Sequence, residues 1–426
     1  MGSYFLRCTG CGREHHDDGL RIRCENPHAP SLLRSVYPEK RFNPDQHAPG
    51  ILRYRQWLPL RSLVASAPLP ATFQSEALNK MLGTPNLWLA FNGFWPARGA
   101  NLVTATFKEL EALAVVSRFP RDGRVLVAPS AGNTAVSLAA ACSAADIPAL
   151  IVIPQDAIPS LRFAEPLRDN VKFVAVTDGT YDDAKTFAAQ IATISGFEHE
   201  GGAANVARRD GVGTTLLRSS EVMGRLPDYY VQAIGSGGGA IGAHEAALRL
   251  VADASFGTQL PHLFLVQNSP CAPVDVSWKQ RSPQLLGIED DGEQRAAVAA
   301  LGAKVLGMRV PPYSLPGGLF SILAASGGDT AAVSNQAARL SADLFMQLEN
   351  IDIEPAAAVA LAGLRAGLLE GRIPADAHIL LHLTGGGRQA SLAHRPHAVT
   401  PRLVVPHFPD EHARAALAAT SLFVAA

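Results

Sequence analysis

The sequence predicts an α/β protein with mostly parallel strands, and two observations support this. Short apolar runs at 124–128, 148–153 and 171–176 alternate with helical periods that begin after Ser130 and near Tyr181. Strand–helix–strand alternation of this kind builds parallel sheets covered by helices. Glycine-rich turns also join strands to helices, and the backbone N–H groups of such junctions are suited to binding anions.

Length and composition limit the possible functions. The chain has 426 residues, of which 47% are hydrophobic and 18% charged, so we expect a large core and two or three domains. A formal net charge of −1 provides no overall field that would attract nucleic acid or anionic lipid. No stretch is long and apolar enough to span a membrane, and the N-terminus lacks the apolar core of a signal peptide. We therefore expect a cytoplasmic protein that binds small molecules, with no nucleic-acid or membrane partner.

The N-terminal segment contains three of the five cysteines. Cys8 and Cys11 form a CxxC pair, and Cys24 with His28 supplies a second pair. Four such donors suit tetrahedral zinc, whereas an odd, clustered set of cysteines argues against a disulfide framework. We expect a zinc-ribbon-like segment, with a metal-free remnant as the alternative. A zinc-ribbon nucleic-acid binder is disfavoured because the basic and acidic residues of the segment cancel.

Residues 29–103 are rich in proline and predict irregular structure, with loops and edge strands on the substrate side. Aromatic residues gather at 88–95, where they could also be part of the core. Arg98 follows them in a loop flanked by proline and glycine, where a guanidinium could bind a phosphate or carboxylate. A solvated surface arginine is the alternative interpretation.

The segment TATFKELEA, residues 104–112, places Lys108 in the first turn of a predicted helix. The helix dipole and neighbouring N–H groups disfavour an ammonium there, so they help to lower its pKa. Such a lysine suits imine chemistry with a carbonyl compound. The alternative is a solvated lysine at a helix start. Three motifs later in the sequence favour the catalytic interpretation.

Two turns and one strand end supply those motifs. The turn SAGNT, residues 130–134, presents backbone N–H groups and the Asn133 side chain to an anion, with ordinary helix capping by Ser130 or Asn133 as the alternative. The turn GSGGG, residues 235–239, has the arrangement that holds a phosphate on bare backbone amides. Thr384 ends a buried strand beside three glycines, where its hydroxyl could meet a planar ligand or serve only in a turn.

The second turn also fits the dinucleotide fingerprint GxGxxA, read from Gly235, Gly237 and Ala240. A nicotinamide-dependent oxidoreductase is therefore an alternative, but it needs an acidic residue at the end of the next strand to bind the ribose. The strand HLFLV instead ends in Gln267 and Asn268, which disfavours that enzyme class.

In order and spacing, these motifs resemble the fold-type II pyridoxal-phosphate enzymes, the family of the tryptophan synthase β-subunit. The motifs are TFKELEA with Lys108, SAGNT with Asn133, GSGGG at 235–239 and LTGGG with Thr384. Runs such as GILRYRQWLPL, FNGFWPARGA and EGGAANVARRDGVGT look closer still to the threonine-synthase-related cysteate synthases. Two departures from that pattern, GSGGGAIGAHEA and TATFKE, lie in or next to the site. They bear on the nucleophile or leaving group more than on the cofactor.

The resemblance implies two three-layer αβα domains with mostly parallel sheets. A zinc-ribbon-like segment is expected at residues 1–45. A large cofactor domain is expected from residues 46–115 and 205–426, and a small mobile domain from residues 116–204. We also expect a homo-oligomer.

The resemblance further implies pyridoxal 5′-phosphate as cofactor, with structural zinc as a second expectation. Lys108 would hold the cofactor as an imine and then remove the substrate Cα proton. Asn133 would bond the ring 3′-oxygen, and Thr384 would face the pyridine nitrogen. The cofactor phosphate would be bound by Gly235, Ser236, Gly237, Gly238 and Gly239. The substrate carboxylate would be bound by Ser130, Ala131, Gly132 and Thr134.

The implied reaction is β-replacement on O-phospho-L-serine through an aminoacrylate, with sulfite giving L-cysteate and phosphate. A neutral hydroxyl at Thr384 suits such elimination, because the ring nitrogen stays largely unprotonated. Arg98, Arg208 and Arg209 are candidates for binding the leaving phosphate. The alternatives are a different nucleophile, a threonine-synthase-type γ-elimination on O-phosphohomoserine, and a binding protein without activity.

Overall fold

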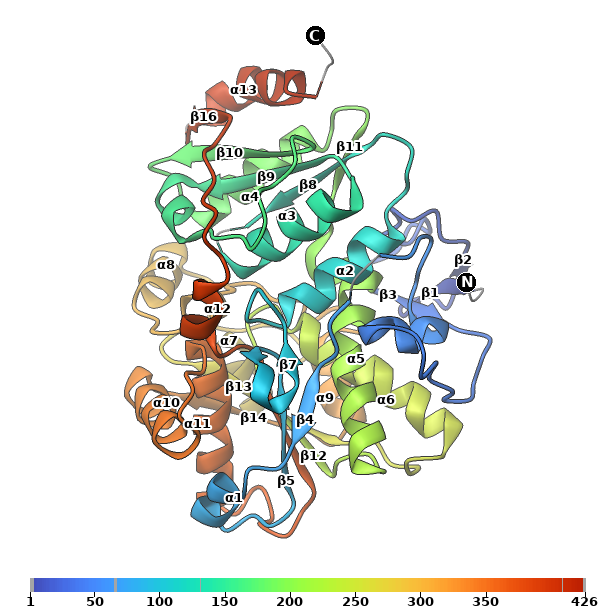
Figure 1. Cartoon of the computed structure of the whole chain (residues 1–426), viewed down its shortest axis with the longest axis vertical. Coiled ribbons are helices and arrows are strands. Elements are labelled where there is room, and N and C mark those ends of the chain that lie inside the picture. Colours follow the sequence, from blue (N-terminus) through green and yellow to red (C-terminus); the bar gives the residue numbers. More distant parts are fainter. Residues whose placement is uncertain (1–3, 65–66, 131, 408, 424–426) are drawn as a thin grey trace.

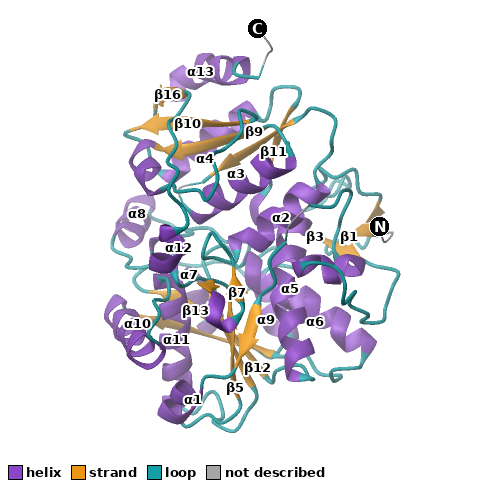
Figure 2. Ribbon diagram, in the orientation of Figure 1, coloured by secondary structure: helices purple, strands orange, loops and turns teal. Residues whose placement is uncertain are grey.

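The structure, a computed structural model, describes residues 4–64, 67–130, 132–407 and 409–423. Two units lie one above the other, and each has a sheet between layers of helices (Figure 1, Figure 2). A small antiparallel sheet from the N-terminus lies at their side (Figure 1). The predicted α/β fold with mostly parallel strands is confirmed. Within the described ranges, no helix is long and apolar enough to cross a membrane.

The larger sheet has six strands in the order β14-β13-β12-β15-β5-β4, and only the pair β4 and β5 is antiparallel. Its strands are β4 (Ala71–Phe73), β5 (Leu87–Phe91), β12 (Tyr229–Ala233), β13 (His262–Asn268), β14 (Asp329–Val333) and β15 (Ile379–Leu383). The central strands are buried along most of their length, as expected for a sheet covered on both faces.

Helices cover both faces of the larger sheet. On one face, α11 (Pro355–Leu369) packs between the sheet and α10 (Asn335–Glu349), which explains why it is apolar around most of its circumference. The other face carries α5 (Val206–Met223), α6 (Gly238–Asp253) and α9 (Leu319–Ala325).

The smaller sheet is entirely parallel, with five strands in the order β11-β8-β9-β10-β16. Its strands are β8 (Val125–Pro129), β9 (Ala149–Pro154), β10 (Val171–Thr177), β11 (Phe197–His199) and β16 (Leu403–Pro406). One face is covered by α2 (Lys108–Arg118) and α3 (Asn133–Ala145), and the other by α4 (Tyr181–Ile191) and α13 (Pro409–Ser421).

The C-terminal part of the chain crosses between the units. Strand β16 pairs with β10 in the smaller sheet, although the sequence analysis placed residues 205–426 with the large unit. The segment that follows α12 (Arg388–Ala393) runs along the molecule to reach that sheet (Figure 1). A four-residue strand carries too little periodicity to reveal its partner. The mobility expected of residues 116–204 stays a prediction.

Residues 29–103 are more regular than their proline content predicted. They contribute β3 (Leu33–Val36), α1 (Glu76–Leu82) and β5, which lies inside the large sheet between β15 and β4. The prediction of loops and edge strands was therefore wrong for β5. The five residues of β5 include no proline, as a central strand requires, because proline cannot donate a backbone hydrogen bond to a neighbouring strand.

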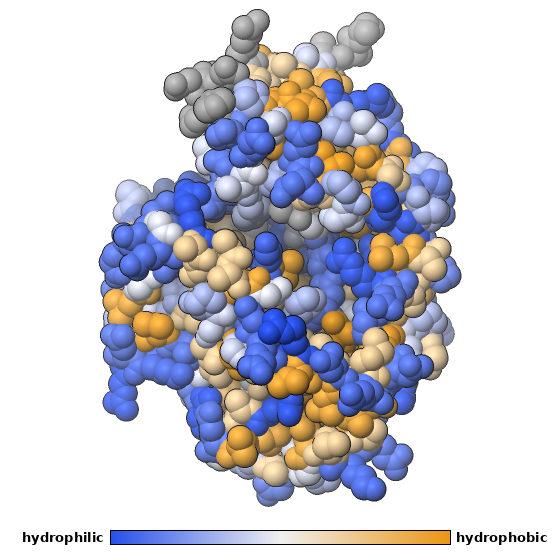
Figure 3. Space-filling view, turned by 90° about the vertical axis from the view of Figure 1, so that its left-hand side faces the viewer, coloured by the Kyte–Doolittle hydropathy of each residue, from blue (hydrophilic) through white to orange (hydrophobic). Residues whose placement is uncertain are grey.

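The N-terminal sheet has the order β2-β1-β3 and contains β1 (Phe5–Cys8) and β2 (Glu14–His15). The remaining elements are β6 (Phe94–Trp95), β7 (Ala100–Asn101), α7 (Pro273–Lys279), α8 (Asp291–Ala299), η1 (Gly50–Trp57), η2 (Pro96–Arg98), η3 (Gln155–Ser160), η4 (Gly202–Ala204) and η5 (Lys304–Leu306). On the face shown in Figure 3, hydrophobic residues lie scattered among hydrophilic ones.

Candidate active site

Lys108 is the first residue of α2, as the sequence predicted. The loop before it pairs with the loop that follows β15. The Phe107 N–H donates to the Thr384 carbonyl at 3.0 Å, and the Gly386 N–H donates to the Ala105 carbonyl at 3.1 Å. Ala105 has a φ of 60°, a left-handed conformation that is uncommon for alanine. The fold thus joins two motifs that are far apart in the sequence.

The Lys108 ammonium is held by a carboxylate one turn further along α2. Its Nζ lies 3.0 and 2.9 Å from the two carboxylate oxygens of Glu111. Burial lowers the pKa of Lys108, Glu111 counteracts this shift, and the positive charge of Arg208 adds to it. The direction of this shift is the predicted one, but its main cause is burial, whereas the prediction rested on the helix dipole.

Arg208, on α5, extends this contact into a network. Its guanidinium binds both carboxylate oxygens of Glu200, at 2.9 and 2.7 Å, and lies 3.3 Å from Glu111. We call Lys108, Glu111, Arg208 and Glu200 the lysine network. Its charges alternate in sign, and the donors of Arg208 are already shared by two carboxylates.

The glycine turn has the predicted form. Strand β12 ends at Ala233, and α6 begins at Gly238 after Gly237, whose φ is 73°. A Cβ at Gly237 would lie 2.5 Å from the Leu319 side chain, so both conformation and space require glycine. Among the residues that the structure describes, no side chain caps α6, which leaves N–H groups of its first turn for an anion.

The turn before α3 combines helix capping with a side-chain hydrogen bond to a distant carboxylate. The Ser130 hydroxyl accepts the Ala135 N–H at 2.9 Å, which is the capping role that the sequence left open. Asn133, the first residue of α3, donates its side-chain N–H to Glu354 at 2.9 Å. Ala131, predicted to bind substrate, lies outside the described residues.

Glu354, which the sequence analysis did not single out, is the centre of a second polar group. Its carboxylate accepts from Asn133 and, at 3.2 Å, from Arg388, and its backbone N–H donates to the Gly385 carbonyl at 3.0 Å. Burial raises the pKa of Glu354, while the charges of Arg388 and Arg395 and the Asn133 hydrogen bond oppose that shift. We call Asn133, Glu354, Arg388 and Arg395 the arginine cluster.

The other two candidate arginines make their contacts elsewhere. The Arg98 guanidinium lies over the rings of Phe73 and Trp95, 5.0 and 5.4 Å from their centres. Arg209 is fully buried, and its guanidinium bonds to Glu245 and to two backbone carbonyls. Neither set of contacts includes a residue of the lysine network or the arginine cluster.

Two residues that the sequence analysis missed had a recognisable signal. Glu111 is a charge inside the apolar helix ELEALAVV, at ion-pair spacing from Lys108. Glu354 precedes the apolar helix α11, where a buried carboxylate needs partners. They are 2% and 7% exposed, so each charge is held inside the protein.

An uncharged network lies beneath the site. The Tyr230 hydroxyl is 2.6 Å from His382 Nδ1, and the Asn92 side-chain nitrogen is 2.9 Å from His382 Nε2. Burial lowers the pKa of His382 to about 3, so the ring is neutral at neutral pH. The ring also meets that of Phe107, with centres 5.9 Å apart, and thereby supports the residue before Lys108.

The predicted metal ligands come together on the N-terminal sheet. The ligand atoms of Cys8, Cys11, Cys24 and His28 all lie within 4.8 Å of one another. The sulfurs of Cys11 and Cys24 are 3.7 Å apart, and the Cys8 sulfur is 3.4 Å from His28 Nε2. A zinc ion with Zn–S bonds of about 2.3 Å places ligands about 3.8 Å apart at the corners of a tetrahedron. The four donors therefore fit zinc.

This N-terminal segment is fastened to the C-terminal end of α2. Asp17 accepts from Arg118 at 2.9 and 2.6 Å, and both side chains are buried. Arg118 also donates to Asn205, which caps α5, at 3.0 Å. The helix that begins with Lys108 therefore ends against the segment that carries the metal ligands.

Comparisons with known proteins give the family. Residues 68–385 match the model of a family described as pyridoxal-phosphate dependent enzyme. The chain is 41% identical to the cysteate synthase of Methanocorpusculum labreanum over 91% of its own length and 94% of that protein. It is 42% identical to the cysteate synthase of Methanosphaerula palustris over 91% of its own length and 90% of that protein.

Solved structures share the fold. Threonine synthase from Escherichia coli is similar with a TM-score of 0.53 and 15% identity, over 79% of this chain and 78% of that one. A fungal L-serine ammonia-lyase from Rhizomucor miehei is similar with a TM-score of 0.57 and 15% identity, over 78% of this chain and 98% of that one.

The residues present fit pyridoxal phosphate. The uncapped start of α6 suits its phosphate, and a lysine of lowered pKa suits its aldehyde. The oxidoreductase alternative fails because the family is a different one, and Gln267 instead accepts the Val274 N–H at the start of α7. The chain therefore belongs to the fold-type II pyridoxal-phosphate-dependent enzymes, in the family that includes the cysteate synthases, and its reaction class is β-replacement.

Proposed function

We propose that the enzyme replaces the phosphate of O-phospho-L-serine with sulfite, giving L-cysteate and inorganic phosphate. The Cβ–O bond breaks with its electron pair leaving on phosphate, and the sulfur lone pair of sulfite forms the new Cβ–S bond. The Cα proton is removed before phosphate departs and is returned after sulfite adds. The main support is the identity of 40–42% with several cysteate synthases along about nine-tenths of the chain.

Lys108 is the base in this proposal. When bound, pyridoxal phosphate supplies an aldehyde that binds amines and a conjugated ring that accepts electrons from Cα. Lys108 would hold the aldehyde, and its Nζ would remove and return the Cα proton of the substrate. Burial, which lowers the pKa of Lys108, favours the neutral amine that a base requires.

The remaining roles follow the positions of the motifs. The turn at 235–239, including the Ser236 hydroxyl, binds the cofactor phosphate, and the N–H groups of the turn at 130–134 bind the substrate carboxylate. Asn133 would bind the ring 3′-oxygen. Thr384 would face the ring nitrogen with a neutral hydroxyl, which would leave that nitrogen largely unprotonated and favour prompt loss of a β-leaving group. Support comes from the backbone pairing between the loops of Thr384 and Lys108.

The test is to mix the holoenzyme with O-phospho-L-serine, with and without sulfite, and to measure phosphate and L-cysteate. We expect both products when sulfite is present. Phosphate released only from O-phosphohomoserine would replace the donor and indicate γ-elimination. Phosphate released from O-phospho-L-serine, with incorporation of thiosulfate, sulfide or an amine but not of sulfite, would retain the donor and replace the nucleophile.

We also propose that Cys8, Cys11, Cys24 and His28 hold one structural zinc ion. The tetrahedral spacing of their ligand atoms supports it.

A further inference from the structure

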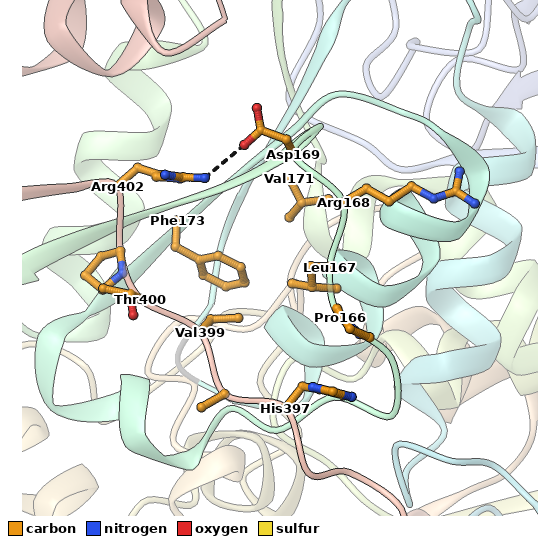
Figure 4. Close-up of a pocket in the computed structure, with 12 residues that line it drawn as sticks. Pro166, Leu167, Arg168, Asp169, Val171, Phe173, His397, Val399, Thr400 and Arg402 are labelled. Carbon is orange, nitrogen blue, oxygen red and sulfur yellow. Dashed lines mark hydrogen bonds and ion pairs between the residues drawn. The ribbon is translucent and has the colours of Figure 1, made fainter.

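Arg395 lies between the loop after β15 and the segment that leads to the smaller sheet. It follows α12, which leads out of the TGGG loop, and precedes the segment that joins the two units. Two residues later, His397 pairs with Phe163 of the smaller unit through reciprocal backbone hydrogen bonds of 2.9 and 3.1 Å. Figure 4 shows this segment beside residues 166–173 of the smaller unit. Arg395 is therefore held where the two units meet.

The Arg395 side chain is buried without a matching partner. The residue is only 5% exposed, and within the described residues its Nε has no hydrogen-bond acceptor. A buried charged group that lacks a hydrogen-bond partner is costly, so proteins rarely retain one without a reason. A ligand that accepts hydrogen bonds would supply the acceptor that the Arg395 Nε lacks.

The carboxylates nearest to Arg395 are already engaged. Its charge acts on Glu354 and Glu109, so both lie close by. Glu354 uses one oxygen for Asn133 and the other for Arg388. Glu109, the neighbour of Lys108 on α2, accepts the Thr104 N–H at 2.8 Å. Burial also raises the pKa of both carboxyl groups. This shift favours their neutral forms, which attract a cation less strongly.

The geometry points to a binding site for an oxyanion at Arg395, near Glu109, which follows the base on α2, and near Glu354, which binds Asn133. We propose that this oxyanion subsite receives the leaving phosphate of the donor and then the incoming sulfite. Both groups must occupy the same region, because one leaves and the other attacks the same carbon. This assignment rests on the proposed function for the identity of the two anions. A guanidinium fits either anion, since its fork of donors matches oxyanion geometry.

The test uses the holoenzyme with inorganic phosphate as the probe, so that oxyanion binding is measured without turnover. Line broadening of the phosphorus resonance gives the dissociation constant for wild type, Arg395→Gln and Arg395→Lys. Arg402→Gln is the matched control: this arginine lies seven positions later on the same segment, is 61% exposed and pairs with Asp169 (Figure 4). We expect Arg395→Gln to weaken phosphate binding about 10- to 100-fold, and Arg402→Gln to leave it unchanged.

Steady-state measurements then separate the parts of the inference. In Arg395→Gln, the KM values for both O-phospho-L-serine and sulfite should rise, while the absorption of the bound cofactor stays as in wild type. A rise for the donor alone would overturn the shared subsite. Phosphate that binds equally to wild type and Arg395→Gln, or not at all to wild type, would overturn the subsite itself.

Two further outcomes keep the test decisive. If Arg395→Gln does not fold, Arg395→Lys retains the charge but loses the fork, and an unchanged phosphate affinity in that variant would refute the inference. If phosphate binding depends on Arg395 but O-phospho-L-serine releases no phosphate, the proposed function fails while the oxyanion subsite stands.

Discussion

The lysine network and the arginine cluster differ in how their charges are matched. In the lysine network, each charge has an opposite partner at 2.7–3.3 Å. In the arginine cluster, Glu354 accepts hydrogen bonds from both Asn133 and Arg388, and the Nε of Arg395 has no acceptor in the described part of the chain. Paired charges stabilise one another without a ligand, whereas a buried donor without an acceptor is stabilised when a ligand supplies that acceptor. The first group is therefore suited to setting the protonation state of a base, and the second to binding.

Removing Lys108 should have the largest effect, and it tests whether the lysine network contains the base. Lys108→Ala should lose covalent attachment of the cofactor on borohydride treatment and lower kcat by about a thousandfold or more, because a general base alone contributes about that much. Mass spectrometry of the treated protein measures the attachment. Arg402→Gln, remote from both groups, serves as the control. Cofactor still fixed to the Lys108→Ala variant through another lysine would refute the assignment.

Loss of the metal should act on α2, which begins with Lys108, from its C-terminal end, where Arg118 binds Asp17 of the N-terminal segment. Elemental analysis should find about one zinc ion per chain, since closed sites of this kind bind tightly. Cys24→Ser should lose that ion and lower the melting temperature, because metal binding contributes to folding free energy. Cys142→Ser alters a buried cysteine outside the ligand set and should retain the ion. Metal-free wild-type protein with equal stability would contradict the site.

Charge changes within the lysine network should move the pH dependence of kcat in opposite directions. Arg208→Gln removes a charge that lowers the pKa of Lys108, so the acidic limb should move to higher pH. Glu111→Gln removes a carboxylate that raises this pKa, so the limb should move to lower pH. Arg388→Gln, in the other group, should leave the limb in place. Shifts of the same sign in the two network variants would show that Lys108 does not set this limb.

Near neutral pH, the smallest effect is expected from His382, beneath both groups. Its pKa of about 3 in the folded protein lies below the usual value of a histidine, so the unfolded chain binds the proton more readily. Stability should therefore fall as pH decreases from about 6.5 toward 3, by up to about 1.4 kcal/mol per pH unit from this residue, with no contribution above that range. Urea unfolding at several pH values should show a shallower dependence for His382→Asn. An unchanged slope would mean that the ring is not held neutral.

Much of the fold and part of the site could be predicted from local patterns. Lys108 at a helix start, glycine at the turn before α6 and the buried strand that leads into Thr384 each depend on a few neighbouring residues. The motifs also follow one another in the order found in the fold-type II pyridoxal-phosphate enzymes, and the resemblance to that family rests on this order. Glu354 could not be found in this way, because its partners Asn133 and Arg388 come from other parts of the chain.

By itself, the sequence determined the alternation of strands and helices, the glycine-rich turn before α6 and the grouping of three cysteines and a histidine near the N-terminus, because these properties depend on short-range periodicity, conformation and spacing. Only the tertiary structure decided that β5 is an interior strand and that β16 joins the second sheet. It also decided that Arg208 and Arg209 bind carboxylates, while the Nε of Arg395 has no acceptor among the described residues. Strand pairing and the partners of a buried charge depend on which distant segments pack together, and no local pattern records that choice.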